Sequence, residues 1–240
     1  MKRLFTVAAL TASLILGSCG SLRNLGNYLS EADAANAIRE ALIIGADFGR
    51  NSIGQRGYFG RDLLLDAILP KEAQRVIQVM DRLGLSTELT RFTNTLGDAT
   101  VEAVTRSGPI FVNGIRRMSI FDAIGIVKNG GTSATDYLRR TIGDTLRGEM
   151  RPIMQTALNE YNVERSWDKL IAPAKALLGN RIGLNLNLDN ILAVLITNEM
   201  FSRIEQQEIA IRTDANARTT ASLQRVFGRD WNKVTVPPRM

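Results

Sequence analysis

Apolar residues recur every three or four positions along most of the chain, a spacing that places side chains on one face of an α-helix. In the segment that begins at Ser86, the clearest stripe consists of Leu89, Phe92, Leu96, Ala99 and Ala103. Comparable stripes follow Ser30, Ser133 and Leu188, and no run of alternating β-branched residues separates them. The pattern predicts an all-α fold, an irregular multi-helix bundle of about eight to nine helices in a single domain.

Glycine and proline interrupt these stripes and indicate where helices end. The glycines from Gly49 onward are expected to end the first helix. Ser107-Gly108-Pro109 is expected to end the helix that begins at Ser86, and Pro152 is expected to kink or break a later one. The segment Ser119-Ile120-Phe121-Asp122 is typical of a capping box, which predicts its serine as a helix N-cap.

The first residues follow a different pattern. A basic start precedes an apolar run from Leu4 to Leu16. A run of about a dozen residues is too short to span a bilayer, which needs roughly 20, but it suits the hydrophobic region of a signal peptide. The run ends in Leu16-Gly17-Ser18-Cys19, which resembles the bacterial lipobox, where the cysteine is acylated and the chain is cut just before it. We therefore predict a lipoprotein signal peptide over residues 1–18 and lipidation of Cys19.

The residues after the cysteine bear on where such an anchor would lie. Gly20 and Ser21 stand where the pattern that retains lipoproteins in the inner membrane has an aspartate. We therefore expect a palmitate-bearing anchor in the outer membrane of the cell envelope, with the protein facing the periplasm. The predicted division of the chain is then a tether over residues 19–29, an all-helical domain over 30–228 and a C-terminal tail over 229–240.

Composition narrows the possible chemistry. The chain has no histidine and its single cysteine is Cys19, which excludes a Ser-His-Asp triad, a Cys-His dyad, imidazole-based metal sites and a disulfide within the chain. We expect no metal and no cofactor. The net charge of +6 falls to +4 without Lys2 and Arg3 of the signal, a mild excess that fits solvated surface or weak attraction to anionic lipids. Nucleic acid is not an expected partner, because no basic run is interleaved with aromatic residues.

Several segments, spread from about residue 30 to residue 228, resemble a bacterial family known only as domain of unknown function 4197, whose members are mostly predicted lipoproteins. The segments that carry the resemblance are Leu69-Pro70-Lys71-Glu72, Ile120-Phe121-Asp122-Ala123, the stretch from Gly130 to Tyr137, Pro152-Ile153, Ile211-Arg212 and Ala217-Arg218-Thr219-Thr220. The resemblance implies the helical fold and the envelope location. It implies no activity, because none is established for the family.

Two features of these segments are candidates for binding an anion or another ligand. The turn Gly130, Gly131 and Thr132 precedes a helix whose first backbone N–H groups can hold a phosphate or carboxylate. The side chains that can converge on an anionic ligand are those of Tyr137, Arg139, Arg212 and Arg218. The alternative interpretation is structural, with caps in the turn and ion pairs that hold helix ends together. Glu205 and Glu208 share a helix, but without histidine they do not indicate a di-metal site.

The leading hypothesis is a bacterial envelope lipoprotein that acts as a non-enzymatic binding or structural module in the periplasm. Its expected partners are the membrane, through the N-terminal lipid, and an envelope protein or an amphiphilic ligand. The alternative is a carrier that holds a lipid or another amphiphile in a cavity between helices. An enzyme without histidine would require a pocket where Ser or Tyr meets Lys or Asp.

Overall fold

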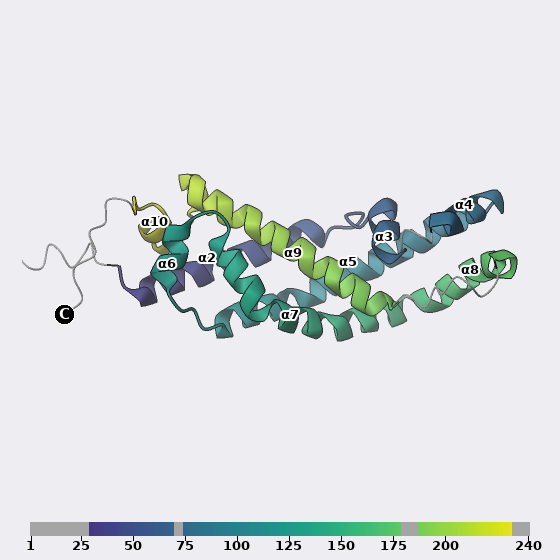
Figure 1. Cartoon of the computed structure of the whole chain (residues 1–240), viewed down its shortest axis with the longest axis horizontal. Coiled ribbons are helices and arrows are strands. Elements are labelled where there is room, and N and C mark those ends of the chain that lie inside the picture. The colour runs from purple at the N-terminus through teal and green to yellow at the C-terminus, as the bar shows by residue number, and fades with distance from the viewer. Residues whose placement is uncertain (1–28, 70–73, 179–186, 232–240) are drawn as a thin grey trace, which may run out of the picture.

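The computed structural model describes residues 29–69, 74–178 and 187–231. Within these residues the chain forms nine α-helices and one short 3-10 helix, and no strand. Figure 1 shows that the helices form one elongated bundle. The all-α, single-domain prediction is therefore confirmed. The predicted signal peptide and nearly all of the predicted tether lie outside the described residues.

Four long helices form the body of the bundle. They are α2 (Glu31–Ile53), α5 (Ser86–Arg117), α7 (Ser133–Glu160) and α9 (Leu188–Thr213). Helix α9 packs against α2 and α7, and α5 also packs against both α2 and α7. The shorter elements are α3 (Arg61–Ile68), α4 (Gln74–Arg82), α6 (Ala123–Asn129), α8 (Val163–Leu178), the 3-10 helix η2 (Ala215–Ala217) and α10 (Ala221–Phe227).

The bundle has two distinct ends, which we name by the short helices that form them. Helices α6 and α10 lie at one end together with the start of α2, and α4 and α8 lie at the opposite end (Figure 1). At the α6/α10 end, Ser30 caps α2: its hydroxyl accepts the Asp33 N–H at 3.1 Å, and the Asp33 carboxylate accepts the Ser30 N–H at 3.2 Å. This capping box confirms the predicted start of the first helix.

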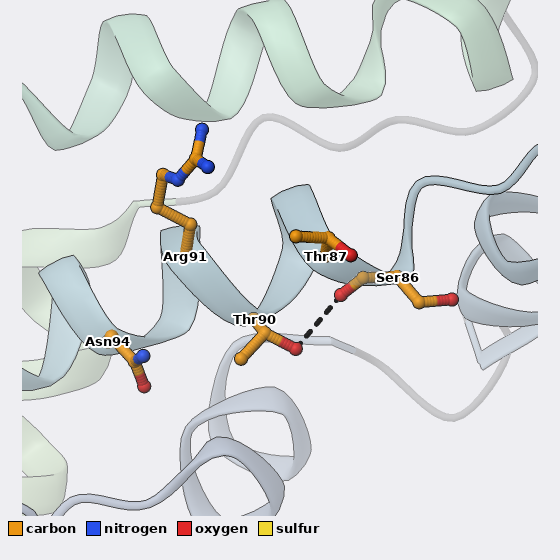
Figure 2. Close-up of a pocket in the computed structure, with 5 residues that line it drawn as sticks. All are labelled: Ser86, Thr87, Thr90, Arg91 and Asn94. Carbon is orange, nitrogen blue, oxygen red and sulfur yellow. Dashed lines mark hydrogen bonds between the residues drawn. The ribbon is translucent and has the colours of Figure 1, made fainter.

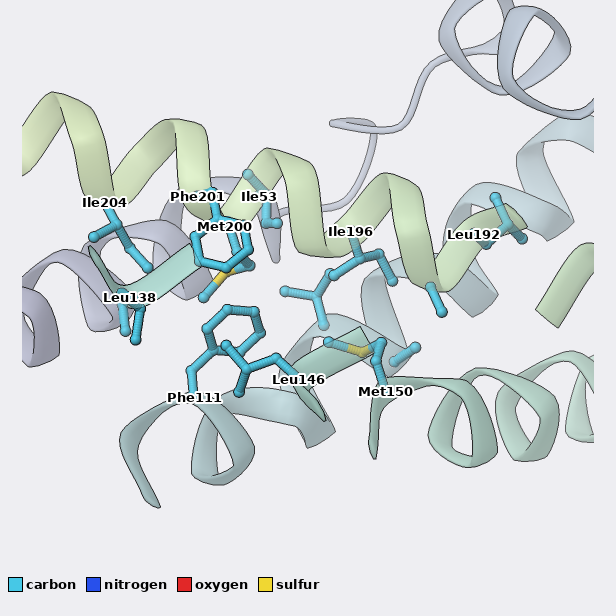
Figure 3. Close-up of a cluster of buried hydrophobic side chains, with 14 of the residues drawn as sticks. Ile53, Phe111, Leu138, Leu146, Met150, Leu192, Ile196, Met200, Phe201 and Ile204 are labelled. Carbon is cyan, nitrogen blue, oxygen red and sulfur yellow. The ribbon is translucent and has the colours of Figure 1, made fainter. Parts of the chain in front are cut away.

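The core lies where α2, α5, α7 and α9 face each other. Phe111 of α5 and Phe201 of α9 meet edge to face, with ring centroids 6.2 Å apart. Both rings are fully buried, as are Met150 of α7 and Ile196 of α9 nearby. Figure 3 shows these side chains filling the space between the helices. Apolar burial of this kind is the dominant stabilising contribution to the bundle.

Helix α2 does not end at Gly49, as the glycine pattern predicted, but continues to Ile53. The reason is its packing on α9. A Cβ atom added at Gly45 would lie 3.1 Å from the Ile204 Cα, and one at Gly49 would lie 3.1 Å from the Met200 Sδ. The two glycines therefore allow a close approach of the helices instead of breaking α2.

The expected helix end at Pro109 is also wrong, and Pro152 does not break its helix. Helix α5 runs through Pro109, and α7 runs through Pro152. A proline inside a helix removes one backbone hydrogen bond. Phe111 follows the first proline by two residues, Met154 follows the second likewise, and both side chains are completely buried. Buried packing directly after each proline therefore helps to hold one continuous helix.

The first residues of the predicted C-terminal tail contact α10. The Trp231 indole N–H donates to the Val226 carbonyl oxygen at 3.1 Å, so this part of the predicted tail is tied to α10. The remainder of the predicted tail, residues 232–240, lies outside the described residues.

Candidate functional site

The structure brings several of the predicted binding residues to the turn between α6 and α7. Gly130 and Gly131 form this turn with positive φ angles of 70° and 57°, a conformation that glycine adopts without strain. Thr132 is the residue before α7, and Arg212 lies in the last turn of α9. Arg218 follows η2, which comes directly after α9.

The first backbone N–H groups of α7 hold a carboxylate that belongs to the chain itself. One oxygen of Glu208 accepts the Ala134 N–H at 2.9 Å, and the other accepts the Thr135 N–H at 2.8 Å and the Thr135 hydroxyl at 2.6 Å. Glu208 is only 1% exposed. The anion that a helix N-terminus attracts is here a side chain of α9.

Arg212 neutralises this buried carboxylate and binds the end of α6 at the same time. Its Nε and Nη2 donate to Glu208 at 3.0 and 2.8 Å. Its Nη1 donates to the carbonyl oxygen of Val127 at 2.9 Å, and Nη2 also donates to the hydroxyl of Ser133 at 3.0 Å. The Arg212 guanidinium lies 5.0 Å from the centroid of the Phe227 ring. The pair thus puts a negative group at the start of α7 and a positive group at the end of α6, as the helix dipoles favour.

The other predicted arginines also make contacts within the chain. Arg218 donates from Nε and Nη2 to the carbonyl oxygens of Ile211 and Arg212, both at 2.8 Å, and so caps the end of α9. Arg139 pairs with Glu205 at 2.6 Å and lies 4.9 Å from the centroid of the Phe201 ring. This geometry agrees with the structural interpretation, in which caps and ion pairs hold helix ends together. Binding of an external anion by these residues stays a prediction.

Tyr137 and the turn before α6 form a second polar cluster. The Tyr137 hydroxyl donates to the Ser119 carbonyl oxygen at 3.0 Å and accepts the Phe121 N–H at 3.3 Å. The N-cap of α6 is Asp122, whose carboxylate accepts the Gly125 N–H at 3.2 Å. The predicted capping box at Ser119 is therefore wrong, because α6 begins three residues later than that box requires.

The structure also shows a polar cluster that was not predicted from the sequence, in which Glu199 and Arg203 of α9 contact Tyr58. The Tyr58 hydroxyl donates to Glu199 at 2.6 Å and accepts from Arg203 at 2.7 Å. Burial raises the pKa of Tyr58 above its ordinary value, and the hydrogen bond to the Glu199 carboxylate raises it further. The cluster ties the loop after α2 to α9.

A pocket lined by described residues lies on the first turns of α5. It has a volume of about 430 Å³ and is open to solvent, and its lining consists of Ser86, Thr87, Thr90, Arg91 and Asn94. Figure 2 shows these side chains along one stretch of the helix, with the Thr90 hydroxyl bonded to the Ser86 carbonyl oxygen. Ser86 also donates to Asp81 at 2.7 Å, in an exposed position. The contact of Ser86 with Asp81 is of the kind that an enzyme without histidine would require, but no lysine lies among the described lining residues.

Two further observations concern metals and membranes. In residues 29–69, 74–178 and 187–231, no group of three or more His, Cys, Asp or Glu side chains is arranged to hold a metal ion. None of the helices described in these ranges combines the length and apolar character that a membrane span requires.

Comparison with known families gives one match. A model described as a protein of unknown function, DUF4197, matches residues 28–228. The chain belongs to the DUF4197 family. The match begins just before α2 and ends just after α10, so the DUF4197 region coincides with the helical body. No curated protein and no solved structure matches the chain. Membership in the DUF4197 family brings no activity with it.

Proposed function

We propose that the chain is an envelope lipoprotein, in which acylated Cys19 tethers the DUF4197 body to the outer membrane and the body acts in the periplasm as a non-enzymatic binding or structural module. The observation that carries the proposal is the sequence Leu16-Gly17-Ser18-Cys19 after a short apolar run. Several acyl chains hold a protein on a membrane without a spanning helix, since each buried methylene contributes roughly 0.8 kcal/mol.

The position of the first described residue supports a tethered body. Leu29 precedes α2 at the α6/α10 end of the elongated bundle (Figure 1). The nine residues from Gly20 to Tyr28 span at most about 30 Å when fully extended. An anchor at Cys19 would therefore keep the α6/α10 end near the lipid surface and leave the α4/α8 end free to extend away from it.

The buried polar groups support a non-enzymatic role. The Glu208 carboxylate and the Arg212 guanidinium bind each other and the ends of α6 and α7. Their contacts serve the fold, and a reacting group needs an approachable position beside a substrate. A specific turnover activity in the purified protein would contradict this part of the proposal.

The carrier alternative has less support. It requires an elongated apolar cavity between helices, whereas the side chains of Phe111, Met150 and Phe201 fill the space between α5, α7 and α9 (Figure 3). The described residues that line the pocket on α5 are Ser86, Thr87, Thr90, Arg91 and Asn94, and none of them has a wholly apolar side chain.

Labelling in cells tests the anchor. The full chain and a Cys19→Ser variant are expressed in bacteria fed with an alkyne analogue of palmitate, and the cells are separated into membrane and soluble fractions. We expect label and membrane location for the unaltered chain and neither for Cys19→Ser. Ser18→Ala is the matched control, because it keeps a small residue before the cysteine and should be labelled. An unlabelled chain, or label that persists in Cys19→Ser, contradicts the proposal.

A further inference from the structure

We propose that the turn before α6 docks onto an anionic lipid surface, with the Phe121 side chain inserted among the lipids and basic groups around it bound to head groups. The inference extends the proposed function and rests on it for the identity of the membrane. Phe121 is 75% exposed, which is the largest exposed fraction among the large apolar side chains described. An exposed aromatic ring can bury its apolar surface at a membrane interface, where such side chains lie between lipid and water.

The exposure of Phe121 is built into a fixed turn. Its backbone N–H donates to the Tyr137 hydroxyl, which in turn donates to the Ser119 carbonyl oxygen. The next residue, Asp122, has a φ of 53°, a left-handed conformation that is uncommon outside glycine. Backbone strain held in place by several polar contacts is typical of positions kept for a function. The turn therefore presents the ring outward in a defined position.

This turn lies beside the point where the tether enters the body. The backbone N–H of Ile124, three residues after Phe121, donates to the Glu31 carboxylate in the first turn of α2 at 3.2 Å. Leu29 is two residues before Glu31. A lipid at Cys19 would therefore hold Phe121 within the reach of the tether from the bilayer.

The charges around the turn suit an anionic surface. Arg116 and Arg117 are exposed in the last turn of α5, just ahead of the turn, and Lys128 is exposed in the last turn of α6. Within the described part of the chain none of these three side chains forms a salt bridge, although the structure pairs many other arginines with carboxylates. The nearby carboxylates of Glu31 and Asp122 accept backbone N–H groups instead. Exposed basic groups around an apolar side chain favour binding to anionic head groups.

Vesicle binding tests this inference without the lipid anchor. Residues 20–240, the predicted mature chain without the cysteine that would be acylated, are sedimented with vesicles of phosphatidylethanolamine alone or mixed with phosphatidylglycerol. We expect the unaltered chain to bind the mixed vesicles, with an affinity that falls as salt is added. At a given salt concentration, the affinity of Phe121→Ser for these vesicles should be about tenfold lower than that of the unaltered chain. Replacing both arginines, in Arg116→Gln/Arg117→Gln, should also weaken binding to the mixed vesicles.

Two control variants make the result specific. Phe48→Ser removes another exposed aromatic side chain, 42% exposed on α2, and should bind as the unaltered chain does. Phe121→Leu keeps an apolar side chain and should retain most of the binding. Equal losses in Phe48→Ser and Phe121→Ser, or no binding to anionic vesicles by the unaltered chain, overturn the inference. Failure of Cys19 acylation would overturn the proposed function and leave this vesicle measurement unchanged.

Discussion

Glu208 and Arg212 lie on one face of α9, four residues apart, and this spacing lets the two side chains reach each other. Transfer of an isolated charge into the protein interior costs several kcal/mol, and the cost is offset only when the charge is paired and its hydrogen bonds are made. Here the carboxylate accepts two backbone N–H groups and a hydroxyl in addition to the guanidinium. The pair therefore couples α9 to both helices at the α6/α7 turn.

Glu208→Gln tests this role at the residue scale. The amide keeps the shape of the side chain but leaves the Arg212 charge buried without its counter-charge. We expect the free energy of unfolding to fall by about 3 kcal/mol, measured by urea denaturation.

Glu205→Gln is the matched control, because Glu205 is a neighbouring glutamate whose partner Arg139 is more exposed. The free energy of unfolding of Glu205→Gln should fall by less than about 1 kcal/mol. Equal losses of unfolding free energy in Glu208→Gln and Glu205→Gln would contradict a larger stabilising contribution from the buried Glu208 pair.

At the scale of elements, the contact between α2 and α9 depends on glycine. A leucine at Gly45 must displace the Ile204 backbone, since even a Cβ atom would lie 3.1 Å from the Ile204 Cα. We expect Gly45→Leu to lower the free energy of unfolding by about 2 kcal/mol or more. Gly148→Leu in α7 is the control: no atom lies within 4 Å of a Cβ there, so better helix propensity should leave stability equal or higher. Similar destabilisation in Gly45→Leu and Gly148→Leu would contradict the close packing of α2 on α9 at Gly45.

The cap of α2 gives a pH dependence. Hydrogen bonds from Ser30, with a smaller contribution from Arg225, hold the pKa of Asp33 below its ordinary value of 3.8. A lowered pKa in the folded state adds stability above that ordinary value, and this stability is lost as the pH falls through the lowered pKa. Asp33→Asn should therefore be less stable than the unaltered chain at neutral pH, and the difference should shrink on acidification. Chemical denaturation at several pH values measures it, and a difference that does not change with pH contradicts the assignment.

The helices were predictable from the sequence where a capping residue or an apolar stripe determines where they begin. Ser30 and the stripe after Ser86 give the starts of α2 and α5 correctly. Helix α3 was missed, because its eight residues carry too short a stripe among nearby glycines. The continuous passage of α5 through Pro109 follows from packing on other helices, which one-dimensional spacing does not contain.

The candidate site was predictable only in part. The turn at Gly130 and the arginine at position 212 do come together, as the hypothesis of convergence required. The sequence did not indicate which anion the start of α7 holds. A signal was present: Glu208 takes a core position in the stripe between Ile204 and Ile211, and a charge in such a position indicates a buried partner.

At the scale of the whole molecule, the bundle is a long body with one end beside the tether. In the proposed arrangement the α6/α10 end faces lipid, and the α4/α8 end extends into the periplasm. Fold and family are common to every function considered above, so neither decides among them. The proposed arrangement depends on the lipid at Cys19.

Mass spectrometry of the native protein, purified from its own cells after fractionation of the envelope, tests that dependence most directly. A lipid-anchored protein should yield an N-terminal peptide that begins at Cys19 with acyl chains on the thiol, in material from the outer membrane. An N-terminal peptide that still contains residues 1–18, with an unmodified cysteine and in cytosolic material, would contradict the proposed anchor.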